Sequence, residues 1–68
     1  MKNRVKPLRE ARRLTQQELA KAVGVSRQAI NAVETGKYDP SVWLAWHLAR
    51  FFKLSIEEVF QFEEGQHV

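Results

Sequence analysis

The chain has 68 residues and no cysteine, so we expect one small cytoplasmic domain over residues 1–68, without disulfide bonds or thiolate metal sites. No run of about 20 apolar residues predicts a membrane span, and the charged residues 1–4 predict no signal peptide. Eleven Lys and Arg against eight Asp and Glu give a net charge of +3; residues 55–68 hold four Glu and no base, so residues 1–54 carry +7. This asymmetry favours a polyanion partner on one face, and an unevenly charged but ordinary solvated surface is the alternative.

The N-terminal segment predicts a short extended stretch followed by a helix. Proline is tolerated in a first helical turn, where its N–H would be unpaired anyway, so the first helix is expected to begin at Pro7. Residues 1–5 are then extended. The alternating aromatic and polar tail at 60–64 resembles a strand, and residues 2–5 could pair with it as a small β-ribbon.

Capping residues mark the later helices. Two S/T-x-x-E capping boxes and two plain serine caps precede apolar runs, namely Thr15 with Glu18, Ser26, Ser41, and Ser55 with Glu58. Gly24 and Gly36 fall where a helix needs a left-handed residue after its last turn. The helices expected from these signals span residues 7–13, 16–23, 27–35, 42–52 and 56–60.

Apolar residues recur at helical spacing within these segments. In the third helix Ala29, Ile30 and Val33 are expected to face inward. The inner side of the fourth helix is expected to carry Val42, Ala45, Leu48, Ala49 and Phe52, with Trp46 as a further core residue. Helices this short are marginal alone, so we predict an all-α fold held together by packing.

The segment from Thr15 to Gly36, TQQELAKAVGVSRQAINAVETG, has the form of a helix-turn-helix over residues 16–35. Gly24 supplies the positive φ that the tight turn needs, and the second helix has a polar exposed side. In this motif the second helix enters the major groove of DNA by its N-terminal end.

The runs LREARRLTQQELA, VSRQAINAVETGKYDPS and SIEEVF resemble the Cro/CI-type (Xre) helix-turn-helix regulators over residues 5–60. The likeness is greatest to short, single-domain bacterial members of the cytolysin-operon repressor type. It implies a five-helix lambda-repressor-like domain, with a small β-ribbon from the two termini in the shortest members. It also implies a homodimeric repressor that binds a near-palindromic double-stranded DNA operator, without cofactor.

The resemblance assigns DNA contacts to particular positions. Arg27, Gln28 and Asn31 lie where the family's recognition helix touches base edges; arginine suits guanine, and glutamine or asparagine suits adenine. Ala32 departs from members that carry a long polar residue there. The positions implied to hold phosphates are Arg13, Gln16, Gln17, Ser26, Lys37 and Tyr38.

Other positions are implied to shape the protein or its assembly. Arg9 and Glu34 lie where the family has an internal ion pair. Trp43 stands where typical members have a polar residue, so we expect a dimer interface at Trp43, Phe60 and Phe62. No metal site is expected, because His47 has no second ligand spaced for it.

Each assignment has an alternative. Arg27 and Gln28 could be ordinary exposed polar residues, and Lys37 and Tyr38 could merely cap their loop. The same fold could serve as an antitoxin or adaptor with an unidentified protein partner, although only eight residues follow Phe60. An enzyme is disfavoured, because no nucleophile or acid–base set emerges. A DNA-binding protein without a membrane span would be cytoplasmic and associated with the nucleoid.

Overall fold

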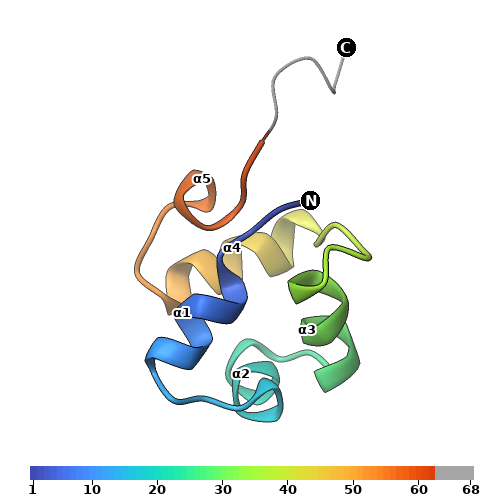
Figure 1. Ribbon diagram of the computed structural model, residues 1–68, viewed down its shortest axis with the longest axis vertical. Helices are drawn as coiled ribbons and strands as arrows, with labels where there is room; N and C mark the ends of the chain where they lie inside the picture. The colour runs from blue at the N-terminus through green and yellow to red at the C-terminus, as the bar shows by residue number, and fades with distance from the viewer. Residues whose placement is uncertain (63–68) are drawn as a thin grey trace.

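The computed structural model describes residues 1–62, and in this range it contains five α-helices and no sheet (Figure 1). The helices are α1 (Val5–Ala11), α2 (Gln16–Val23), α3 (Arg27–Glu34), α4 (Val42–Phe51) and α5 (Ile56–Val59). The predicted all-α class is therefore confirmed. None of the helices in this part of the chain is long and apolar enough to cross a membrane.

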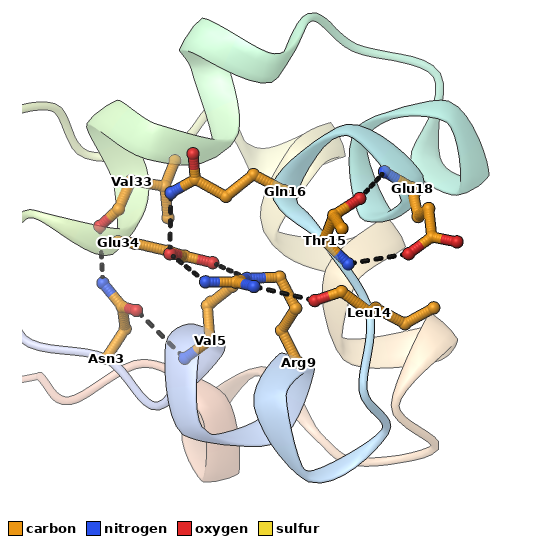
Figure 2. A network of polar contacts seen from close by, with 9 residues as sticks. All are labelled: Asn3, Val5, Arg9, Leu14, Thr15, Gln16, Glu18, Val33 and Glu34. Carbon is orange, nitrogen blue, oxygen red and sulfur yellow. Dashed lines mark hydrogen bonds and ion pairs between the residues drawn. The ribbon is translucent and has the colours of Figure 1, made fainter.

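The predicted caps begin four of the helices. Thr15 Oγ1 accepts the Glu18 N–H at 3.0 Å, and the Glu18 carboxylate accepts the Thr15 N–H at 2.8 Å (Figure 2). Ser55 and Glu58 repeat this capping box at the start of α5. There the hydrogen bonds from the Ser55 N–H and hydroxyl lower the pKa of the Glu58 carboxyl below its ordinary value. Ser26 and Ser41 cap α3 and α4 through their hydroxyls.

The first helix begins at Val5, two residues before the predicted start at Pro7. The reason is Asn3, whose Oδ1 accepts the Val5 N–H at 3.1 Å and whose Nδ2 donates to the carbonyl of Val33, at the end of α3, at 2.8 Å (Figure 2). Pro7 is then the third helical residue, where its missing N–H still costs no helical hydrogen bond.

The two terminal segments pair through one antiparallel bridge between Asn3 and Phe60. The Arg4 N–H donates to the Val59 carbonyl at 2.8 Å, and the Gln61 N–H donates to the Lys2 carbonyl at 2.9 Å. The predicted β-ribbon is thus reduced to a single bridge within the described residues. Residues 63–64 of the predicted strand lie outside them.

The core lies where α2 packs on α3 and α4, with α1 covering α3 and α5 covering α4. Val42 and Trp46, expected in this core, are 81% and 41% exposed. The apolar arc of α4 is wider than the surface its neighbours cover, so its outer part remains in solvent. There Trp46 packs against its own helix, with the Arg50 guanidinium 5.0 Å from its ring.

Two helices end on left-handed residues that are not glycine. Arg13 follows α1 with φ 56° and Lys53 follows α4 with φ 58°. In both places the next N–H closes a Schellman motif, from Leu14 to the Arg9 carbonyl and from Leu54 to the Ala49 carbonyl. Without a glycine to signal these ends, the predicted helices ran to residues 13 and 52, one or two residues too far.

We expect Lys53→Gly to stabilise the protein by about 1 kcal/mol, because a side chain in the left-handed region costs roughly that much. Thermal unfolding would show a rise in Tm of about 4–8 °C for a domain of this size. Lys53→Ala, which keeps a Cβ, is the matched control and should show no such rise. An equal rise for both variants would contradict the strain.

Candidate nucleic-acid interface

A hollow of about 440 Å³ lies between the exposed side of α3, the start of α2 and the loop after α3. Its lining residues are Gln16, Arg27, Gln28, Asn31, Ala32, Lys37 and Tyr38. The structure therefore brings together the three residues expected at base edges and three of the six expected at phosphates. No single stretch of sequence supplies this set.

The first turn of α3 is placed by the Ser26 cap, whose hydroxyl accepts the Ala29 N–H at 3.1 Å. Directly after it come Arg27 and Gln28, both exposed. The opposite face holds Ile30 and Val33, which are buried in the core. Burial of one face thus fixes which side of the helix presents its polar residues to the hollow.

The start of α2 contributes Gln16, which the Thr15 capping box places as the first helical residue. Gln16 Nε2 donates to Glu34 Oε1 at 3.0 Å (Figure 2). The side chain is therefore held against the end of α3. Since helix N-termini present free N–H groups, this corner of the hollow also suits an anion.

Glu34 and Arg9 form an ion pair beneath the hollow, at the positions where the resemblance implies one. Arg9 Nε lies 2.7 Å from Glu34 Oε2 and Arg9 Nη2 lies 3.1 Å from Glu34 Oε1, so the contact is bidentate (Figure 2). Arg9 Nη1 also donates to the Leu14 carbonyl at 2.7 Å. The hydrogen bond to Glu34 raises the pKa of Arg9 above its ordinary value, so this cation keeps its charge at any working pH.

The loop after α3 turns at Gly36, with φ 75°. The N–H groups of Lys37 and Tyr38 both donate to the Ala32 carbonyl, at 3.0 and 3.3 Å. These bonds close the helix and leave both side chains exposed at the edge of the hollow. A lysine and a tyrosine there offer an ammonium and a hydroxyl to an anionic ligand.

Three expected phosphate contacts lie outside the lining of the hollow. Arg13 and Gln17 are exposed residues, one at the left-handed end of α1 and one in the first turn of α2. Ser26 is exposed too, but its hydroxyl already accepts a hydrogen bond as the cap of α3.

The residues expected at a dimer interface divide into two groups. Trp43 and Phe62 are 71% and 61% exposed, whereas Phe60 is only 1% exposed and belongs to the core of the single chain. The Phe60 side chain thus has no surface left for a second copy, which corrects that assignment. Its backbone bridge to Asn3 explains the burial.

His47 has an aromatic environment. Its ring lies 6.0 Å from that of Trp43, in a stacked arrangement, and 5.1 Å from that of Trp46, edge to face. In residues 1–62 no three His, Asp or Glu side chains lie close enough together to hold a metal ion.

Sequence reasoning missed the parts played by Asn3 and Ala32. An asparagine two residues before a helix is a local capping signal, but the Val33 carbonyl that it also binds is distant in sequence. Ala32 was read only as a departure from the family pattern. Its place one turn after Gln28 could have marked it as a neighbour of the base-reading residues.

Comparison with known sequences identifies the same motif. A family model described as helix-turn-helix matches residues 5–59. An HTH-type transcriptional regulator of Methanocaldococcus jannaschii is 52% identical over 66 residues, which cover 97% of this chain and 100% of the relative. The likeness thus extends over the whole of that protein.

Solved structures agree with the fold. The restriction-modification controller protein C.AhdI from Aeromonas hydrophila is similar with a TM-score of 0.76 at 32% identity, covering 84% of this chain and 86% of that one. The P22 c2 repressor, in complex with a synthetic operator, also gives a TM-score of 0.76, at 28% identity and over 79% of this chain and 82% of that one.

We expect Glu34→Ala to destabilise the protein by about 3–5 kcal/mol, because it leaves the Arg9 guanidinium buried and unpaired. The double variant Arg9→Met/Glu34→Met should recover most of this loss. Glu57→Ala, which removes an exposed carboxylate from α5, is the control and should change stability by less than about 1 kcal/mol. Urea unfolding measures all three; equal losses for Glu34→Ala and Glu57→Ala would contradict a structural role for the pair.

Proposed function

Because the chain belongs to the Cro/CI-type helix-turn-helix family, a family of DNA-binding regulators rather than enzymes, we propose that it is a sequence-specific transcriptional repressor. It acts as a homodimer on a near-palindromic operator. The M. jannaschii relative is named as a transcriptional regulator, and the P22 c2 repressor is described with a synthetic operator. Such a function places the protein in the cytoplasm, on the nucleoid.

The observation that carries the proposal is the hollow and the residues that line it. Arg27 and Gln28 occupy the first turn of α3, the part of a recognition helix that reaches base edges. Their side chains are the two types that make bidentate contacts, arginine with guanine and glutamine with adenine. Asn31, one turn after Arg27, is a third base contact in this proposal.

The edges of the hollow suit the DNA backbone. Gln16 stands at the N-terminus of α2, while Lys37 and Tyr38 stand across the hollow from it in the loop after α3. Phosphates bound at these edges would fix α3 in the groove between them. Arg13, Gln17 and Ser26 remain proposed outer contacts.

A separate surface supports the proposed homodimer. Trp43 and Trp46 lie edge to face on the outer side of α4, with ring centres 6.1 Å apart. Beside them an apolar groove of about 200 Å³ is lined in part by Val42 and Phe62. We call Val42, Trp43, Trp46 and Phe62 the aromatic surface. Exposed apolar area of this kind in a small domain marks an interaction site.

In the homodimer, two copies joined through the aromatic surface present two recognition helices. Half-sites read by such a pair lie about 34 Å apart, one turn of DNA. The operator then mirrors the two-fold axis of the protein as a near-palindrome. A protein partner on the aromatic surface is the second candidate, which the exposed tryptophans favour, and solution measurements separate the two.

Binding to a pool of randomised duplexes at two salt concentrations tests the function. We expect the retained sequences to contain a near-palindrome with half-sites about 10 base pairs apart. Affinity should fall steeply with salt, because phosphate contacts release counterions. A pool retained without sequence preference would contradict the proposal and leave a general basic surface.

Removal of the proposed base contacts should abolish selective binding. We expect Arg27→Ala/Gln28→Ala to weaken operator binding by at least about 100-fold, since each bidentate pair contributes roughly 1–3 kcal/mol. Lys53→Ala/Gln61→Ala removes the same charge and amide from exposed positions outside the hollow and serves as the control. Titration of a labelled operator gives both affinities; wild-type affinity for the first variant would refute the assignment.

The aromatic surface should control assembly. We expect Trp43→Ala/Phe62→Ala to shift the protein from dimer to monomer in sedimentation equilibrium, because burial of large aromatic side chains dominates interface energetics. Tyr38→Ala also removes an exposed aromatic ring, but from the hollow, so it should leave the dimer intact and weaken DNA binding. A monomeric wild-type protein, or a double variant that remains dimeric, would contradict this interface.

A further inference from the structure

Ala32 differs from its neighbours in the hollow. Of the described residues that line it, Ala32 alone has no polar atom in its side chain. Its methyl group is partly buried, so it is recessed between longer polar side chains. The hollow therefore contains an apolar point that cannot donate or accept a hydrogen bond.

The backbone fixes the place of this methyl group. Ala32 lies one helical turn after Gln28, so the two residues share a face of α3. Its own carbonyl receives the N–H groups of Lys37 and Tyr38 at 3.0 and 3.3 Å. Ala32 thus stands between the proposed base contacts on one side and the proposed phosphate contacts on the other.

We propose that Ala32 is a specificity-determining residue that selects a thymine by contact of its methyl group with the thymine 5-methyl. This inference rests on the proposed operator binding and names one base that the hollow reads. The thymine 5-methyl is the apolar group that the base pairs present in the major groove. A side chain of one carbon reaches the group that projects into the groove and makes no hydrogen bond with any other base.

The contact has a signature that separates it from the polar contacts around it. Two methyl groups carry no charge, so their interaction should not change with salt, unlike that of Lys37 with a phosphate. Its size should be that of one buried methyl group, which corresponds to a roughly fourfold change in affinity. Structural disturbance of α3 would instead weaken binding to every sequence equally.

A double-mutant cycle between the protein methyl and the DNA methyl tests the proposal. The wild-type protein and Ala32→Gly are titrated against the selected operator and against operators in which each thymine in turn is replaced by deoxyuridine. We expect one position per half-site at which this replacement weakens wild-type binding roughly fourfold and leaves Ala32→Gly binding nearly unchanged. The ratio should be the same at both salt concentrations.

Two further variants protect the test. Ala22→Gly removes the same methyl group from an exposed helical position in α2 outside the hollow, so it should keep the wild-type discrimination. Ala32→Ser serves if glycine unfolds the helix, and its hydroxyl should also reduce the discrimination. Each comparison between thymine and deoxyuridine is made on one protein, so differences in helix stability cancel.

The inference is overturned if no thymine position discriminates in the wild type, if the selected half-site has no thymine, or if Ala32→Gly keeps the full fourfold ratio. In each case operator binding itself would stand. Failure of the proposed function is distinct, because it would already appear as a duplex pool without a selected sequence.

Discussion

The Glu34 carboxylate is the interaction on which the arrangement of the helices depends. It lies at the end of α3, is 3% exposed, and accepts hydrogen bonds from Arg9 of α1 and Gln16 of α2. Arg9 extends the contact to the Leu14 carbonyl in the connection between α1 and α2. Three helices and one loop therefore meet at a single buried group. A buried pair of this kind adds little net stability but specifies one geometry, and here that geometry fixes the angle between the two helices of the motif.

The small size of the chain explains why its local signals are so clear. Helices of 4 to 10 residues have little stability of their own, so each end that can be capped by a side chain matters. Thr15, Ser26, Ser41 and Ser55 perform this role by bonds within three residues, which is why the sequence predicts α2 to α5 well. Gly24 is equally local, because its left-handed conformation ends α2 through its own backbone.

Features that depend on distant contacts could not be predicted in this way. The start of α1 is set by Asn3, which reaches a carbonyl 30 residues away. The exposure of Val42 and Trp46 depends on how much of α4 the other helices cover, and periodicity does not contain that information. The hollow was predicted in part, since the resemblance pointed to most of its residues, but its closure by the Lys37 and Tyr38 backbone on Ala32 is a property of the folded loop.

The position of Asn3 has a consequence for the relation between the two surfaces. Its backbone pairs with Phe60, next to the terminal part of the aromatic surface, and its side chain binds Val33 at the end of α3. A dimer that reads two half-sites needs a fixed distance between its recognition helices, so a loose connection between interface and helix would weaken selection by half-site spacing. Asn3 supplies a short connection, from the paired termini directly to α3. The same side chain that starts α1 thereby holds the proposed assembly surface in a defined position relative to the residues proposed to read DNA.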